Sequence, residues 1–255
     1  PQKNVSYFAF TATPKPETLQ QFGTKHADGT FKPFSLYTMR QAIEERFILD
    51  VLRNYTTYDQ YWALLKKVKD DPQFEEVKTK KLLKQFVSRH ERTIAKKVAI
   101  IVEHFQTVVS DKLGGKAKAM IVTSSRLHAV RYKLAVDAFL KKHGLPLKAL
   151  VAFTDVVKDS KDGKEYTEAN MNGFPEAATA DRFEADEYRF LIAASKFQTG
   201  FDQPKLLAMY VDKKLSGVAC VQTLSRLNRT FPGKEETFVL DFENEAEDIE
   251  DSFQP

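Results

Sequence analysis

Short apolar runs alternate with amphipathic segments through the second half of the chain. The runs with the length and composition of buried strands are 119–123, 147–153, 190–195, 206–211 and 237–242. Helical periodicity lies between them, in segments 125–144, 178–183 and 218–229. Strands that alternate with helices predict an α/β fold with a parallel sheet and helices on both faces.

The first half has a different pattern. Residues 5–10 read as a buried strand, residues 33–38 as a short strand and residues 38–52 as a helix. An apolar strand so close to a chain end needs sheet neighbours, so we expect the chain to be a piece of a longer protein. Residues 58–113 contain helical periodicity and no strand-like run, which predicts a helical insertion. The insertion is either an arm that faces DNA or a partner, or a helical extension of the core.

Composition is that of a globular protein. Of 255 residues, 42% are apolar and 29% are charged, which excludes a disordered chain and a membrane protein. The first residues lack the pattern of a signal peptide, so we expect a cytoplasmic protein. The single cysteine, Cys220, excludes disulfides and predicts burial, and the five histidines lack ligand spacing, so no metal site is expected.

Charge is mildly basic overall and uneven along the chain. The net charge is +4, with lysines concentrated between Lys66 and Lys97 and between Lys112 and Lys118. This balance permits a nucleic-acid partner through phosphate contacts without demonstrating one. The tail from Asp241 to Asp251 carries only acidic charges, and we expect it to be solvated.

The stretch from Phe190 to Thr230 has the strongest chemical pattern. Its polar loop, residues 196–204, precedes a helix on which Gln222, Arg226 and Arg229 share the face opposite the apolar one. Two fixed cations beside a loop suit a triphosphate, whose charge is spread over several oxygens. Arginines at this spacing are more often solvated or paired with carboxylates.

Two other matches to chemical motifs fail. Residues 114–116, Gly-Gly-Lys, lack the upstream glycine and the following hydroxyl of a phosphate-binding loop, so they predict a turn. Asp71, Glu76 and Lys78 imitate a nuclease carboxylate-lysine set, but they lie in a helical context instead of on paired strands. Neither match is expected to be a site.

Four short motifs occur in an informative order. FTATP looks like motif III of superfamily 2 helicases, MIVTSSR like motif IV, FQTGFDQP like motif V and QTLSRLNR like motif VI. Together they resemble the second motor half of such a helicase or translocase. The segments YFAFTATPKPETLQQFG, FSLYTMRQAIEERFILDVLRNYTTY and GKAKAMIVTSSRLHAVRY resemble, more specifically, the motor (R) subunit of type I restriction enzymes. That similarity runs along nearly the whole chain and is least distinctive between 62 and 91.

The resemblance implies a RecA-like domain that closes on a first RecA-like domain around ATP. It places Arg226 and Arg229 at the γ-phosphate, with Arg229 as the arginine finger. Gln222 would hold the nucleotide or neighbouring loops, and Asp202 would reach the ribose or a motif VI arginine. Gly200, beside Asp202, would let the backbone approach closely.

The same resemblance implies DNA contacts and a coupling element. Thr199, with Gly200, matches a position that touches DNA phosphate or couples to it. The remaining hydroxyl positions are Thr123, Ser124 and Ser125, which would offer hydroxyls and a helix N-terminus to a phosphate, and Thr11 and Thr13, which would link hydrolysis to movement. Each of these hydroxyls could instead serve only a turn or a helix cap.

Some parts of the family pattern are absent. The Walker A loop, the Walker B carboxylates and the nuclease motif do not occur, and in the family they lie upstream of motif III. We therefore expect the chain to begin just after them. Arg46 stands where the family would have a small residue, which leaves the packing of that helix open.

The expected layout has five parts. Residues 1–15 end the first RecA-like domain, 16–57 link to and start the second, 58–113 form the helical insertion, 114–242 form the second RecA-like core and 243–255 form the acidic tail. The expected function is that of the second motor domain of an ATP-dependent double-stranded DNA translocase in a type I restriction endonuclease. ATP and Mg²⁺ would be bound mostly by the first motor domain, and the fragment alone would be inactive.

The implied partners are double-stranded DNA, the first RecA-like and nuclease domains of the same subunit, and the modification and specificity subunits. Two alternatives stay open at this point. One is another superfamily 2 helicase or remodelling ATPase, and the other is a non-catalytic DNA-binding or scaffold module that kept the fold.

Overall fold

The computed structural model describes residues 4–11, 13–70, 93–197 and 200–253, and it divides the chain into two compact units. The first unit comprises Pro1–Ile48 and the second Leu49–Pro255. No helix among the described residues has both the length and the apolar character needed to cross a membrane.

The first unit holds two short helices and a small hairpin. Helix α1 spans Pro16–Phe22 and starts with a proline, which has no amide to leave unsatisfied in the first turn. Strands β1 (Thr24–Lys25) and β2 (Phe31–Lys32) pair antiparallel. Helix α2 spans Met39–Glu44, and Thr38 and Gln41 close a reciprocal capping box at its start.

Three sequence predictions for the first unit are wrong. Residues 5–10 and 33–38 form no strand, and Phe8, Phe10 and Phe34 are 80%, 95% and 92% exposed. An apolar run becomes a buried strand only beside a sheet, and no described strand pairs with these runs. The helix expected over 38–52 stops at Glu44, because Arg46 adopts a φ of 61° that ends the helix.

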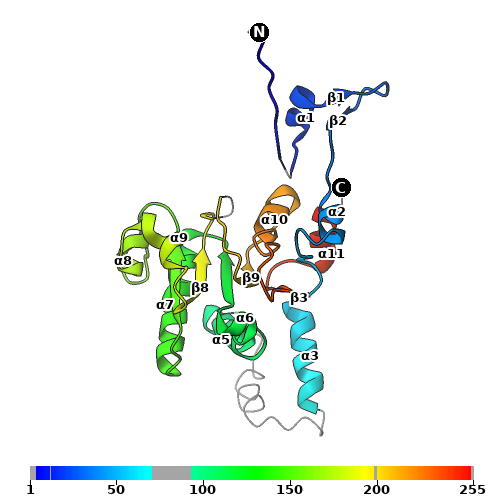
Figure 1. Ribbon diagram of the computed structural model, residues 1–255. Coiled ribbons are helices and arrows are strands. Elements are labelled where there is room, and N and C mark those ends of the chain that lie inside the picture. The colour runs from blue at the N-terminus through cyan, green and yellow to red at the C-terminus, as the bar shows by residue number, and fades with distance from the viewer. Residues whose placement is uncertain (1–3, 12, 71–92, 198–199, 254–255) are drawn as a thin grey trace. The chain divides into compact units, whose positions relative to one another are not determined.

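The second unit is built on one parallel sheet of six strands in the order β3-β10-β9-β4-β8-β5. The strands are β3 (Tyr55–Thr57), β4 (Lys118–Thr123), β5 (Lys148–Ala152), β8 (Tyr188–Ala193), β9 (Leu206–Asp212) and β10 (Phe238–Asp241). Strand β4 is central, with Ile121 between Tyr210 of β9 and Ile192 of β8. Helices lie around the sheet (Figure 1). This arrangement confirms the predicted RecA-like α/β fold.

Alternate residues of the strands feed two apolar cores, one on each face of the sheet. One core joins sheet residues such as Ile121 to α5 (Ile94–His104), the π-helical turn Phe105–Val109 and α7 (Arg126–Lys142). Helix α3 (Tyr58–Asp70) packs against the same core through Tyr58 and Tyr61. The other core lies under α10 (Gly217–Leu224) and α11 (Ala246–Phe253). Burial on both faces explains why the strands read as continuous apolar runs.

The predicted helical insertion is helical where it is described, and residues 71–92 lie outside the described part. Helix α5 is buried continuously from Lys97 to His104. Residues 94–109 therefore belong to the core, which favours the alternative of a core extension for this part. The glycines after it, Gly114 and Gly115, have φ angles of 63° and 76° at the end of α6 (Lys112–Gly115), and this confirms the predicted turn.

Two peripheral segments contain regular structure. Residues 155–180 contain a hairpin, β6 (Val157–Lys158) with β7 (Glu165–Tyr166), followed by α8 (Glu168–Asn172), a 3₁₀ turn (Glu176–Ala178) and the start of α9 (Thr179–Arg182). The acidic tail forms α11, whose Ile249 is fully buried and helps cover the sheet. Cys220 is buried beside it, as predicted.

Candidate functional site

The two arginines of motif VI lie in a turn and not on the helix. Helix α10 ends at Leu224, so only Gln222 of the predicted face is helical. After it the backbone tightens, with the amide of Leu227 donating to the carbonyl of Leu224 at 3.0 Å. Leu224 and Leu227 are both fully buried, and bringing two leucines three residues apart into one core favours this tighter turn. The prediction of a continuous helix through Arg229 is therefore wrong.

The turn nevertheless brings both arginines to the loop that follows β8. Arg226 donates from Nη1 to the carbonyl oxygen of Phe201 at 2.9 Å. Arg229 forms an ion pair in which Nε lies 2.8 Å from Oδ1 of Asp202. The arginine side chains thus join motif VI to the backbone and a side chain of motif V.

The electrostatics of this pair favour an anion. The pKa of Arg226 is lowered, first by burial and next by the positive charge of Arg229, while Asp202 acts in the opposite direction. Two guanidinium groups therefore repel each other beside one carboxylate. An additional anion with several oxygens would relieve that repulsion and could accept hydrogen bonds from both forks.

The described part of the loop between β8 and β9 contains three left-handed residues, and the open space at Gly200 gives no sign of the close backbone approach expected there. Ser195, Phe197 and Gly200 have φ angles of 61°, 64° and 71°, in the left-handed region. A Cβ at Gly200 would meet no atom within 4 Å, so the dihedral angle is the local reason for glycine there. Thr199 lies outside the described residues, and its contact with DNA phosphate stays a prediction.

The three hydroxyls at the end of β4 and directly after it have different surroundings. Thr123 is fully buried and donates to the carbonyl oxygens of Ala193 at 3.1 Å and Ser125 at 3.3 Å, so its hydroxyl does not face solvent. Ser125 caps α7 by accepting from the amide of His128 at 3.2 Å. The hydroxyl of Ser124 lies 2.9 Å from Nδ1 of His128. Both serines are exposed, so of the three only they are placed to meet a phosphate.

The hydroxyls of motif III lie in the first unit. The amide of Thr13 donates to Oγ1 of Thr11 at 3.1 Å, which is a local turn contact. Their role in coupling hydrolysis to movement stays a prediction.

A buried charged cluster at the carboxyl ends of the strands was missed by the sequence analysis. Asp212 ends β9 and is 2% exposed. Lys97 donates to its Oδ1 at 2.5 Å and to Glu243 at 3.2 Å, and Tyr132 donates to its Oδ2 at 2.6 Å. Nε2 of His128 lies 3.5 Å from the same carboxylate. An aspartate directly after an apolar strand was the available signal.

Hydrogen bonds decide the charge of Asp212. Burial alone would raise its pKa, but the hydrogen bonds from Lys97 and Tyr132 outweigh burial and lower the pKa. Asp212 is thereby held as a carboxylate that ties α5 and α7 to the end of β9. Its partners occupy both carboxylate oxygens, so we assign this cluster a structural role.

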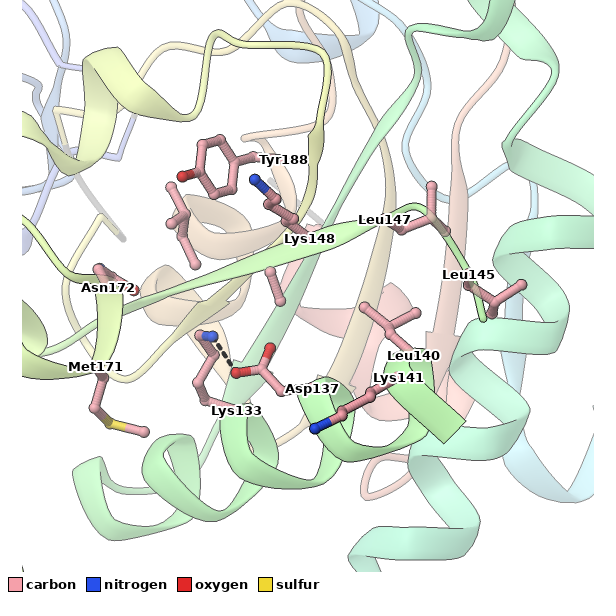
Figure 2. Close-up of a pocket in the computed structure, with 12 residues that line it drawn as sticks. Lys133, Asp137, Leu140, Lys141, Leu145, Leu147, Lys148, Met171, Asn172 and Tyr188 are labelled. Atoms are coloured by element: carbon pink, nitrogen blue, oxygen red, sulfur yellow. Dashed lines mark hydrogen bonds and ion pairs between the residues drawn. The ribbon is translucent and has the colours of Figure 1, made fainter. Parts of the chain in front are cut away.

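The pocket drawn in Figure 2 lies apart from the predicted site residues. It has a volume of about 370 Å³ and lies among α7, β5 and α8. Two of its three lysines form ion pairs: Lys133 pairs with Asp137, and Lys148 lies 2.7 Å from Glu187. None of the predicted site residues lines it. Within the described residues no group of three or more His, Cys, Asp or Glu side chains could hold a metal ion.

Comparison with known proteins places the second unit in a family context. Residues 161–244 match the family model described as Type I restriction enzyme subunit R domain 3, a range that contains both the loop after β8 and the arginine turn. The chain is 26% identical over 264 residues to a Methanocaldococcus jannaschii protein described as a MjaIXP endonuclease subunit, which covers 98% of the chain and 24% of that protein. The chain is also 26% identical over 255 residues to the SauMRSORF196P type I restriction enzyme endonuclease subunit of Staphylococcus aureus. That match covers 89% of this chain and 26% of the Staphylococcus protein.

A solved structure with a similar arrangement is a fragment described as an HsdR subunit of a type I restriction enzyme from Vibrio vulnificus. It shares 15% identity, with a TM-score of 0.46 over 84% of this chain and 36% of that one. The sequence matches confirm the resemblance to the R subunits of type I restriction enzymes. The chain spans about a quarter of the length of these two curated relatives.

Proposed function

We propose that this chain is the second motor domain of an ATP-dependent double-stranded DNA translocase, within a type I restriction endonuclease motor subunit. The observation that carries the proposal is the meeting of Arg226 and Arg229 with Phe201 and Asp202. That contact joins the two motifs that would face nucleotide and DNA, and it lies within the range that matches the R subunit family.

In this proposal Arg229 exchanges Asp202 for the γ-phosphate of ATP when a first motor domain closes on this one. The exchange is feasible because the pair is partly open to solvent, with side chains 35% and 69% exposed. Arg226 supplies the second cation, and Gln222 and Gly200 lie beside it on α10 and in the loop. A cation delivered on closure stabilises the charge of the phosphoryl-transfer transition state and is worth little before closure.

ATP and Mg²⁺ would be held mainly by the first motor domain. This chain would add the arginines from one side, while Ser124, Ser125 and Thr199 would contact the DNA backbone. The partners are then double-stranded DNA, the first motor and nuclease domains of the same subunit, and the modification and specificity subunits of a cytoplasmic restriction complex.

The experiment that tests the proposal uses the complete subunit that contains this chain, assembled with its partner subunits. Displacement of a third DNA strand from a distant triplex reports movement along duplex DNA. We expect displacement that requires hydrolysable ATP and is lost in Arg229→Ala. Salt-dependent DNA binding without ATP-dependent displacement would instead favour the non-catalytic DNA-binding module.

A further inference from the structure

Lys234 is a buried cation beside the arginine turn that the sequence motifs do not include. It is 6% exposed, and its ammonium donates to the carbonyl oxygen of Leu227 at 2.8 Å and to that of Pro204 at 3.1 Å. Among the described residues no carboxylate forms an ion pair with it. Burying an ammonium without a counter-ion is unfavourable, so a function of the two carbonyl contacts would explain why the charge lies there.

Lys234 is one of three cationic side chains that bond to the loop segment 201–204. Arg226 bonds to the carbonyl oxygen of Phe201, Arg229 pairs with Asp202, and Lys234 bonds to the carbonyl oxygen of Pro204. The first two attachments are partly exposed, whereas the third is buried. The second contact of Lys234, to Leu227, lies within the arginine turn itself.

The difference in exposure separates the roles of the three cations. A triphosphate that draws the side chains of Arg226 and Arg229 toward itself would separate them from Phe201 and Asp202. Lys234 is buried and donates to two carbonyl oxygens, so it would keep these contacts. The loop and the turn would then stay joined while the arginines change partners.

We propose that Lys234 is a positioning residue that holds the loop segment 201–204 to the turn 225–229 when the two arginines leave the loop for a phosphate. The inference rests on the proposed function and adds to it a residue that keeps the DNA-facing loop coupled to the nucleotide-facing turn. Lys234 contacts neither nucleotide nor DNA, so its removal should affect the communication between the two ligands more than the binding of either.

Charge on Lys234 should matter because charge-assisted hydrogen bonds are the stronger ones. Burial, and next the charge of Arg229, lowers the pKa of Lys234 to about 7. The carbonyls of Pro204 and Leu227 and the guanidinium of Arg229 are the groups that the structure places around its ammonium. The attachment should therefore be strongest below about pH 7 and weaken as the pH rises.

The test compares the complete subunit with its Lys234→Met variant by the ratio of ATP turnover with duplex DNA to turnover without it. We expect that ratio to fall about tenfold in Lys234→Met while the dissociation constant for ATP changes less than threefold. Lys234→Arg, which retains the charge, should recover part of the ratio. The matched control is Lys205→Met, because Lys205 adjoins the same loop but its ammonium lies 3.6 Å from Asp186.

A second measurement keeps the inference testable if Lys234→Met does not fold. In the wild-type subunit the stimulation ratio should fall about threefold between pH 6 and pH 9, and Lys205→Met should show the same fall. A constant ratio across that range, or a Lys234→Met variant with the wild-type ratio, would overturn the role of Lys234. If DNA does not stimulate the wild-type subunit at all, the proposed function fails, which is a different result.

Discussion

Nε of Arg229 lies 2.8 Å from Oδ1 of Asp202, so the predicted arginine finger is paired with a carboxylate of the loop after β8. Such a partly exposed pair is worth about 0–1 kcal/mol. If a phosphate replaces Asp202 as the partner of Arg229, the carboxylate competes with the nucleotide. The pair then acts as a resting position for the arginine, which nucleotide binding must break.

The first prediction concerns that competition. Asp202→Asn in the complete subunit removes the competing charge, so we expect the affinity for ATP to rise by up to about fivefold, the equivalent of about 1 kcal/mol. Equilibrium titration with a fluorescent ATP analogue measures it. Asp186→Asn is the control, because Asp186 is exposed and pairs with Lys205. A weaker affinity in Asp202→Asn would show that Asp202 holds the nucleotide itself, for example at the ribose.

The isolated 255-residue chain should not hydrolyse ATP. In the proposed function its arginines would supply one side of an ATP site, and the phosphate-binding loop and metal-binding carboxylates of such a site do not occur in this sequence. Phosphate release measured with and without duplex DNA should match the rate of buffer alone. DNA-stimulated release that disappears in Arg229→Ala would contradict this prediction.

The fold could be predicted well where burial is continuous. Strands β4, β5, β8, β9 and β10 all appear as apolar runs because both faces of the sheet are covered. Strand β3 was missed because it has three residues, too few to show a period. The prediction of a strand at 5–10 is wrong because an apolar run alone does not show whether a neighbouring strand is present to bury it.

The contact between the loop after β8 and the arginines could be predicted from the sequence, but its geometry could not. Motif order brought the loop at 200–202 and the arginines together, yet the helix period placed Arg226 and Arg229 on a helix that ends before them. Arg46 stands where we expect a small residue, and the structure gives a backbone reason for that expectation. Its φ is 61°, in a region that glycine adopts most easily.

Clusters of residues that are far apart in the chain could not be predicted from the sequence. Lys97, Tyr132, Asp212 and Glu243 come from four separate segments, and each reads locally as an ordinary helix or strand-end residue. Their juxtaposition depends on which strands are neighbours, which only the sheet order β10-β9-β4 provides.

Removal of the cation from that cluster should be strongly destabilising. Lys97→Met leaves the buried carboxylate of Asp212 without its ammonium partner, and breaking a buried pair costs about 3–5 kcal/mol. Urea unfolding followed by the fluorescence of the single tryptophan, Trp62 on α3, measures the loss. Lys116→Met, an exposed control, should change the free energy of unfolding by less than about 0.5 kcal/mol.

A double variant separates the charge effect from loss of packing. If the unpaired charge is the cause, Lys97→Met combined with Asp212→Asn should recover part of the stability that Lys97→Met alone loses. A loss below about 1 kcal/mol in Lys97→Met would mean that Asp212 does not depend on Lys97.

Stability should decline in mild acid because of His104. This residue is buried next to the Tyr210 hydroxyl, 2.9 Å from its Nδ1, and burial lowers its pKa from 6.5 to about 4. In the unfolded chain His104 therefore binds a proton below about pH 6.5, whereas in the folded chain it binds one only below about pH 4. The free energy of unfolding is at its full value above pH 6.5 and falls as the pH decreases toward 4.

Between pH 7 and pH 5 we expect His104 to account for a loss of about 2 kcal/mol. Urea unfolding at the two pH values, again followed by Trp62, measures the loss. His104→Gln should lack this contribution, while His143→Gln, at an exposed position, should retain it. Equal pH dependence in the two variants would show that His104 is not the group responsible.

The most direct test of the central claim, that Arg229 completes an ATP site, is single-turnover ATP hydrolysis by the complete subunit on duplex DNA. For Arg229→Ala we expect the hydrolysis rate constant to fall about 10³-fold or more, while the dissociation constant for ATP changes only a few-fold, because the finger acts chiefly in the transition state. Arg53→Ala, which removes an exposed arginine, should match the wild type. An Arg229→Ala subunit that loses ATP binding but retains the wild-type rate constant at saturation would contradict the claim.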